Sequence, residues 1–170
     1  FPADWRSAGD QTPDWAYGAI LYDKAPDPAD PPFMYAIASK LTGNVDPNKI
    51  LDLASGQLDE LPDFKSAGGP PERTKLDGYD AVSYGGTYTW EGKSRAVGQE
   101  TIVIPGKDAL FVLQLNGEAP KGQEQAVRDA ADSEWPGVAN FYEDRFGRAV
   151  FHGRFARFDP EGTAAEGNWI

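Results

Sequence analysis

The sequence predicts an α+β domain in which helices pack on an antiparallel sheet, followed by a C-terminal β-hairpin extension. The regular segments come in the order two strands, helix, three strands, helix, without the strand-helix alternation that builds a parallel sheet. The three later strands are joined by short turns, and each carries apolar or aromatic residues at every second position. Such alternation is typical of an antiparallel sheet that packs one face against a core.

The first two strands flank a proline-rich loop. Residues 16–23 (AYGAILYD) are apolar and aromatic, and the segment "KAPDPADPP" follows them. Because proline lacks the amide hydrogen that a strand ladder needs, this loop ends the first strand. Residues 33–42 (FMYAIASKLT) form the second strand, which ends before Gly43.

A helix is predicted to begin after Asp46. The carboxylate of Asp46 can accept hydrogen bonds from the free amides of the first turn, and Pro47 suits the first helical position. Gly56 weakens the helix locally and Pro62 stops it. One apolar stripe recurs at spacings of three and four, which indicates a buried face: Leu51, Ala54, Leu58 and Leu61.

Three strands are predicted over residues 79–90, 94–104 and 109–117, joined by the turns "EGK" and "PGKD". The first of these strands has one strongly aromatic face, formed by Val82, Tyr84, Tyr88 and Trp90. Two adjacent glycines in its "SYGGTY" segment indicate a bulge or a close approach of another chain segment. The segment "GQEQAVRDAADSE" then predicts a short second helix with Ala126, Val127, Ala130 and Ala131 turned inward.

The last 36 residues differ in composition from the rest. Residues 135–170 contain four arginines and no lysine, and "EDRFGRAVFHGRF" predicts a hairpin that turns near Phe146 and Gly147. We therefore expect two units, residues 1–134 and residues 135–170. In the second unit, the arginines are candidates for contacts with partner chains: Arg145, Arg148, Arg154 and Arg157.

The composition excludes several classes of function. A net charge of −11 repels phosphate backbones and anionic lipid head groups, so nucleic acid is not expected as a partner. The absence of cysteine excludes disulfides, thiolate zinc sites and a cysteine nucleophile. No stretch reaches the roughly 18 apolar residues of a membrane span. The chain starts at Phe1 without methionine, so we expect a processed or trimmed protein.

The sequence offers no catalytic constellation. His152 is the single histidine, which excludes multi-histidine metal sites and histidine-based triads, and we interpret it as a structural residue on a strand. No serine lies in a Gly-x-Ser-x-Gly elbow, and no phosphate loop or dinucleotide fingerprint occurs. The denser groups of carboxylates lie on loops and polar helix faces. We expect them to be solvated there, without the shielding that shifts the pKa of a catalytic carboxylate. We therefore predict a protein that is not an enzyme and that uses no cofactor or metal.

Aromatic side chains are the remaining functional signal. They fill cores in most proteins, but the phenol and indole groups of the aromatic face also offer apolar faces with polar tips. Such chemistry suits a sugar-bearing or lipidic ligand. We hypothesise a cleft between this face and the leucine stripe of the first helix, with six ligand-binding residues: Tyr84, Tyr88, Trp90, Leu51, Leu58 and Leu61.

Residues 15 to about 133 resemble the LpqN/LpqT family of secreted actinobacterial lipoproteins. The distinctive segments are "LTGNVDP", "LPDF", "GYDA", "GGTY" and "TIVIPGKDALFVLQLN", in this order. The resemblance implies a PsbP-like α+β fold and an exported protein on the periplasmic side of the cell envelope, held by a lipidated cysteine upstream of Phe1. It further implies binding of trehalose-linked lipids or of other envelope proteins, without enzymatic activity.

The C-terminal extension departs from this family, which normally ends near the second helix. Its "GR-x-VF-x-GR" pattern resembles short strands of tail-tip proteins in bacteriophages that infect the same hosts. Two hypotheses therefore stay open: a non-enzymatic envelope protein that binds a glycolipid or a membrane-protein partner, and a structural or adhesive module of a multi-chain assembly such as a virion. In the second, the extension docks to neighbouring subunits.

Overall fold

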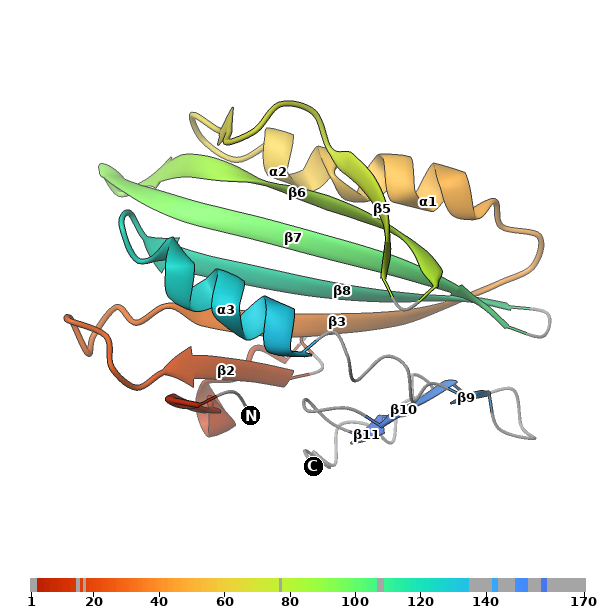
Figure 1. The fold of residues 1–170 in the computed structure, drawn as a ribbon, viewed down its shortest axis with the longest axis horizontal. Coiled ribbons are helices and arrows are strands. Elements are labelled where there is room, and N and C mark those ends of the chain that lie inside the picture. The colour runs from red at the N-terminus through yellow and green to blue at the C-terminus, as the bar shows by residue number, and fades with distance from the viewer. Residues whose placement is uncertain are drawn as a thin grey trace.

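The computed structural model describes residues 3–14, 16, 18–76, 78–106, 109–134, 142–143, 149–152 and 157–158. For residues 76, 131–134 and the last three ranges, the structure describes only the backbone. The described part contains one large sheet with helices on both faces (Figure 1), which confirms the predicted α+β class.

The large sheet has eight antiparallel strands in the order β1-β2-β3-β8-β7-β6-β4, and β5 also pairs with β6. Five of its strands are short or of moderate length: β1 (Trp5–Ser7), β2 (Gly18–Tyr22), β3 (Phe33–Thr42), β4 (Lys65–Ser66) and β5 (Glu72–Leu76). The three longest, β6 (Tyr79–Trp90), β7 (Lys93–Pro105) and β8 (Ala109–Pro120), form the predicted meander.

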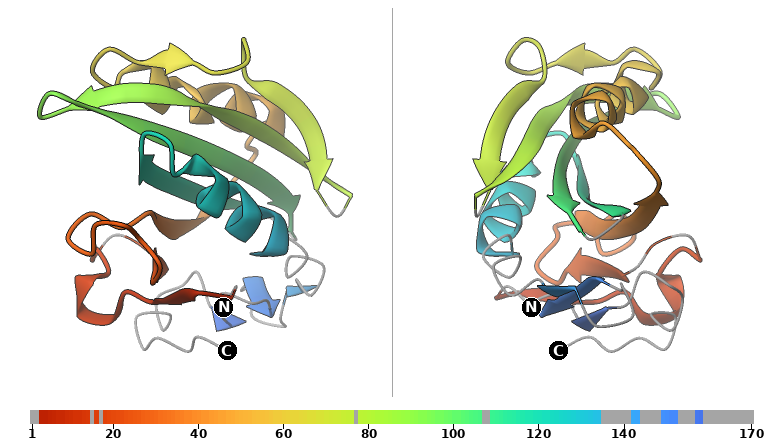
Figure 2. Two further views of the ribbon diagram at one scale, coloured as in Figure 1. Left: turned by 60° about the vertical axis from the view of Figure 1, so that its left-hand side comes forward. Right: turned by 90° about the vertical axis from the view of Figure 1, so that its right-hand side faces the viewer.

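The helices divide between the two faces of the sheet. Helices α1 (Pro47–Ala54) and α2 (Gly56–Asp59) lie on one face, and α3 (Glu124–Glu134) lies on the other; a short 3-10 helix, η1 (Gly9–Gln11), follows β1. Figure 2 shows the sheet curving around α1, with α3 on the outer side. We call these surfaces the α1 face and the α3 face.

Helix α1 begins as the sequence predicts. The Asp46 side chain accepts a hydrogen bond of 2.9 Å from the backbone amide of Asn48, and Pro47 is the first helical residue. Leu51 is completely buried against Val82, and Val103 and Leu110 complete the cluster. The helix breaks between Ala54 and Gly56, where the sequence predicts a weak point.

The core on the α3 face joins distant parts of the chain. Its buried members come from six strands and from α3, including Trp5, Ile20, Ile102, Phe111 and Ala130. Ala126 and Val127 pack against this cluster, as the predicted inward face of the second helix requires. The sequence did not predict β1, in which Trp5 pairs with Tyr22 and brings their rings to 5.5 Å.

A separate three-stranded sheet lies in the C-terminal extension, with β10 (Ala149–His152) between β9 (Tyr142–Glu143) and β11 (Arg157–Phe158). The pairing of Ala149 with Glu143 is centred on residue 146 and confirms the predicted hairpin. Arg145, Arg148 and Arg154 lie outside the described residues, and only the backbone of Arg157 is described, so their proposed contacts stay a prediction. The division into two units also stays a prediction.

No helix in the described ranges is long and apolar enough to cross a membrane.

Candidate functional site

A grid of nine residues forms the centre of the α3 face. Each of β6, β7 and β8 contributes three alternate residues, which point to the same face of the sheet. These residues line up across the three strands. The middle row consists only of glycines, Gly85, Gly98 and Gly117, and we call it the glycine row. The rows on either side are Ser83, Glu100 and Leu115, and Thr87, Ala96 and Ala119.

The grid is the floor of a groove with a volume of about 560 Å³. One wall is formed by Glu124, Val127 and Arg128 of α3, and the other by residues 66–70 together with Glu72 of β5. Small residues dominate the floor, and its members on β6 and β7 are partly exposed, whereas Leu115, Gly117 and Ala119 of β8 are buried. A cavity of this size and mixed lining matches those that hold small ligands in other proteins.

Glycine occupies the positions in and beside the floor for different structural reasons. A Cβ at position 117 would lie 2.1 Å from Cγ1 of Val127, so glycine allows α3 to pack directly on β8. A Cβ at Gly86, next to the row, would lie 2.0 Å from the carbonyl oxygen of Lys65, which is the close approach that "SYGGTY" predicts. By contrast, a Cβ at Gly98 would meet nothing within 4 Å. Gly98 therefore faces open space in the groove.

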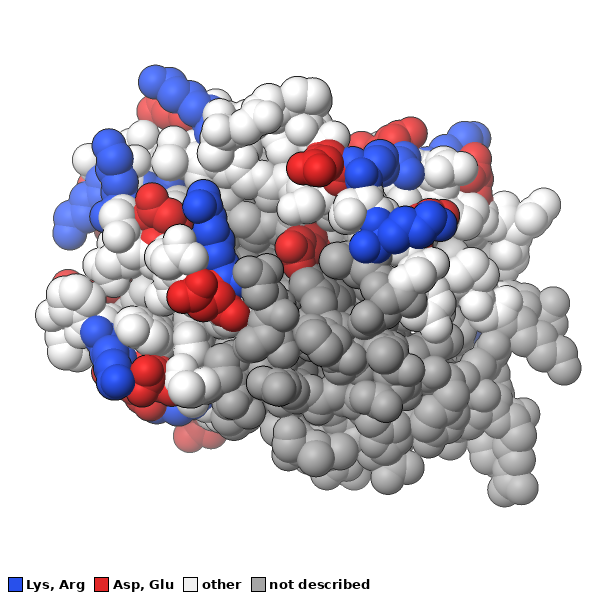
Figure 3. All heavy atoms as spheres, in the orientation of Figure 1, with Lys and Arg blue, Asp and Glu red and all other residues white. Residues whose placement is uncertain are grey.

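The described residues that line the groove include more acidic than basic ones. Glu72, Glu100, Glu118 and Glu124 are acidic, although Arg95 binds the Glu118 carboxylate, and Arg128 of the α3 wall is basic. Figure 3 shows charged side chains of both signs over β5, with largely uncharged surface beside them. The Glu124 carboxylate also accepts a hydrogen bond of 2.7 Å from the amide of Gly122 at the start of α3.

The residues of the predicted cleft lie on the opposite, α1 face. Val82, Tyr84, Tyr88 and Trp90 share that face in the register of β6, as the alternation predicts. Leu51 and Leu58 are buried and Leu61 is half-buried. The sheet residues that meet Leu51 are Val82, Val103 and Leu110.

Tyr84 lies on the α1 face, between the part of β6 that pairs with β4 and the part that pairs with β5. Its hydroxyl donates a hydrogen bond of 2.7 Å to Asp59 of α2, and its ring packs edge-on against Phe64 at 5.4 Å. The hydrogen bond to Asp59 raises the pKa of Tyr84, because ionisation would place two negative charges side by side. Tyr84 also lines the groove, and it is the one predicted ligand-binding residue that does so among the described residues.

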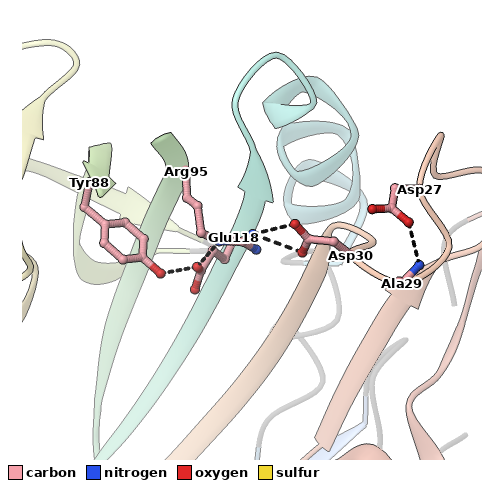
Figure 4. A network of polar contacts seen from close by, with 6 residues as sticks. All are labelled: Asp27, Ala29, Asp30, Tyr88, Arg95 and Glu118. Atoms are coloured by element: carbon pink, nitrogen blue, oxygen red, sulfur yellow. Dashed lines mark hydrogen bonds and ion pairs between the residues drawn. The ribbon is translucent and has the colours of Figure 1, made fainter. Parts of the chain in front are cut away.

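Tyr88 belongs to an ionic cluster at the end of the α1 face (Figure 4). Its hydroxyl donates to the Glu118 carboxylate, and the Arg95 guanidinium binds both Glu118, at 2.5 Å, and Asp30, at 2.8 Å. Burial first, and then the hydrogen bond to Glu118, raise the pKa of Tyr88. Burial alone would lower the pKa of Arg95, but the hydrogen bonds to Glu118 and Asp30 raise it.

A row of buried amides continues from this cluster under α1 and α2. Gln99 donates to Asn116, Asn116 donates to Gln114, and Gln114 donates to Thr101, over distances of 3.0 to 3.1 Å. All four side chains are buried, so their mutual hydrogen bonds compensate the loss of water. We interpret the row as structural.

Trp90 is 56% exposed at the β6–β7 turn, where Glu91 and Gly92 adopt positive φ values of 50° and 77°. The six predicted ligand-binding residues thus lie on the α1 face and, in the case of Trp90, at this turn. Their role in binding stays a prediction.

The sequence prediction missed the groove, although a signal for it exists. The two-residue turn at Glu91 and Gly92 fixes the register of β6 and β7, so counting back from it places Gly85 opposite Gly98. Within the described ranges, no group of three or more His, Asp or Glu residues is placed to hold a metal ion.

Residues 1–134 match the family model described as "Probable lipoprotein LpqN". The chain belongs to the LpqN lipoprotein family. It is 44% identical, over 131 residues, to the lipoprotein LpqN of Mycobacterium tuberculosis, an alignment that covers 77% of this chain. It also superimposes with a TM-score of 0.70 and 44% identity on the crystal structure of an M. tuberculosis LpqN described as involved in cell envelope biogenesis, covering 77% of this chain and 75% of that one.

The chain spans 57% of the length of the curated LpqN relative. The match to the LpqN model ends at residue 134, where α3 ends. The described residues that line the groove therefore all lie inside the part matched by the LpqN family model.

Proposed function

We propose that this chain is a non-enzymatic binding protein of the cell envelope that holds an amphipathic, sugar-bearing lipid in the groove on the α3 face. Membership of a lipoprotein family and the envelope role stated for the M. tuberculosis relative support the location. In this proposal the protein is exported and acts on the periplasmic side of the inner membrane, to which a lipid anchor upstream of Phe1 attaches it.

The observation that carries the proposal is the groove itself. It offers about 560 Å³, with the half-buried Val127 as apolar surface, the buried Met34 and Leu115 beneath it, and hydroxyls and carboxylates around them. A ligand with an apolar chain and a hydroxyl-rich head group matches this combination, since each part finds its own kind of surface. Tyr84 joins the groove to the aromatic face on which the predicted site was based.

Filling the groove tests this function. Gly98 does not adopt a positive φ and has open space above it, so Gly98→Leu adds a side chain to the floor without backbone strain. We expect this variant to bind dodecyl maltoside at least about tenfold more weakly than the wild type in calorimetric titration below the critical micelle concentration. The matched control is Gly56→Leu, at another unobstructed glycine on the opposite face.

Equal affinity of Gly98→Leu and wild type for dodecyl maltoside would contradict a ligand in the groove. Urea denaturation of all three proteins establishes that the substitutions leave folding intact.

The bacteriophage alternative depends on the C-terminal extension, whereas the membrane-protein partner of the first hypothesis would bind the aromatic sheet face and the first helix. The arginines assigned to contacts through the extension lie outside the residues whose side chains are described. The relatives reported above give no support to a virion module, so we do not develop it as a second function.

A further inference from the structure

The turn between β6 and β7 presents an exposed tryptophan at one end of the sheet. Trp90 is 56% exposed, whereas Trp5, the other tryptophan whose side chain is described, is buried. Glu91 and Gly92 adopt the positive φ values of a tight two-residue turn, which holds the tip of the hairpin in a fixed shape. Figures 1 and 2 show this turn projecting beyond the helices.

Three exposed lysines lie around Trp90, and we call the four residues together the tip patch. Lys93 pairs with Trp90 across the turn. Lys121 lies beside them, because its amide donates a hydrogen bond of 3.3 Å to the carbonyl oxygen of Ser94. Lys65 belongs to β4, which pairs with β6 three residues before the tip.

The lysines of the tip patch form no ion pair with the described residues. Several basic side chains elsewhere do, each with one or two carboxylates: Arg6 with Asp23, Lys24 with Asp4, Arg73 with Asp52, Lys75 with Asp80, and Arg95 with Asp30 and Glu118. Figure 3 shows Lys and Arg side chains projecting at the end of the molecule where the β6–β7 turn lies. The tip patch therefore combines an exposed indole ring with ammonium groups that are available to an external partner.

We propose that the tip patch docks on the surface of a phospholipid bilayer. Trp90 enters the head-group region, where its ring meets apolar surface while its N–H still finds a hydrogen-bond acceptor. Lys65, Lys93 and Lys121 contact lipid phosphates through long stems that can lie along apolar surface. This contact uses no residue of the groove lining, so it does not depend on a ligand in the groove.

The shape of the tip and the family of the chain both favour a bilayer over a protein partner. A specific protein interface buries about 800 Å² on each partner. The tip patch instead presents one ring and three separate lysines on a convex turn, which a fluid bilayer can accommodate. Lipoproteins act next to a membrane, so a bilayer lies within reach of a member of this family.

The net charge of −11 opposes the approach of the whole chain to an anionic bilayer, but its range is short. At physiological salt the field of a charge decays over about 8 Å, so the charges near the contact decide. Glu60, Asp63 and Glu91 are exposed acids of the neighbouring turns, and they balance the three lysines. The bilayer thus meets a nearly neutral end of an acidic molecule.

Co-sedimentation with vesicles of equal parts phosphatidylcholine and phosphatidylglycerol tests the role of the ring. We expect the wild type to bind, and Trp90→Ala to partition at least about fivefold more weakly. The matched control is Leu53→Ala, which removes an apolar side chain that is 71% exposed on α1. This control should bind like the wild type.

A second pair of variants tests the lysines on the same vesicles. Lys65→Gln/Lys93→Gln/Lys121→Gln should bind at least about tenfold more weakly, because only the acids then remain at the tip. The control Lys24→Gln/Lys49→Gln/Lys75→Gln removes the same charge at exposed sites outside the tip patch and should bind like the wild type. Circular dichroism establishes that every variant is folded.

Quenching by brominated phosphatidylcholine reports insertion of the ring directly. It should reduce the tryptophan emission of the wild type more than that of Trp90→Phe. Equal quenching would overturn the assignment of Trp90. Absence of vesicle binding by the wild type, or equal losses in the tip variants and their controls, would overturn the docking as a whole. Each of these results leaves the binding of dodecyl maltoside in the groove unaffected, so the two proposals fail separately.

Discussion

At the scale of single residues, Arg95 is the one charged residue that is buried among the residues whose side chains are described. Its side chain is 9% exposed and connects β7 to Glu118 on β8 and to Asp30 in the loop between β2 and β3. The sequence analysis places Asp30 in a solvated loop, but the ion pair holds it at the sheet. An arginine suits this position because its planar fork can bind two carboxylates at once.

Replacing Arg95 by leucine is expected to lower the free energy of unfolding by about 2–4 kcal/mol, because Glu118 keeps its charge in a largely buried place without a cation. The lower end of this range reflects the partial exposure of Asp30, at 38%. Urea denaturation at neutral pH measures the change. The control is Arg6→Leu, whose ion pair with Asp23 is about half exposed and should cost less than about 1 kcal/mol. Equal losses in the two variants would contradict the assignment.

Tyr88 should make the stability of the protein depend on alkaline pH. Its pKa is raised in the folded state from the ordinary value of 10.0, so the folded form keeps its proton where the unfolded form loses it. This contribution is complete below pH 10 and is lost as the pH rises above it, at about 1.4 kcal/mol per pH unit. Tyr88→Phe should therefore show a shallower loss of stability between about pH 10 and pH 11, measured by urea denaturation. The same slope in both proteins would exclude the effect.

At the scale of elements, the packing of α3 on β8 determines the shape of the groove. A helix covers a strip about 10 Å wide, which is about two strand spacings. Since α3 packs chiefly over β8, with Val127 against Gly117, it leaves the neighbouring part of β7 and β6 uncovered. The groove is the uncovered strip, closed on its far side by residues 66–70 and β5.

Two alanine substitutions within the glycine row test this arrangement. Gly117→Ala forces Val127 away from the sheet and should lower the free energy of unfolding by about 1–3 kcal/mol, because valine cannot turn its methyl group aside freely. Gly98→Ala, one strand away on the same row, adds the same methyl group to open space and should leave stability unchanged or slightly higher. Thermal unfolding followed by circular dichroism distinguishes the pair, and an equal shift in both would contradict direct packing of α3 on Gly117.

At the scale of the whole molecule, the sheet separates two layers of different character. The α1 face is closed. It is covered by the apolar contacts under α1, by the row of amides that hydrogen-bond to one another, and by the Arg95 cluster. On the α3 face, a short helix covers only part of the sheet. The ligand binding that we propose for the α3 face uses the side of the sheet opposite to these contacts.

The sequence by itself determined the local structure. Periodicity and turn residues located β3, β6, β7 and β8 closely, and the capping carboxylate of Asp46 located the start of α1, because these signals depend on neighbours in the chain. The resemblance to the LpqN family followed from segments within the same elements. Short strands such as β1, β4 and β5 escaped prediction because they form only when a long strand offers them a partner.

Only the tertiary structure decided which face of the sheet holds the candidate site. The alternation identifies two faces but does not say which one a helix covers completely, since that depends on where α1 and α3 dock. Glu72, Ser83, Glu100 and Leu115 come from four strands and meet in one row only through the pairing of those strands. The sequence therefore predicts a site on the aromatic face, whereas the open groove lies on the opposite face, where the glycines align.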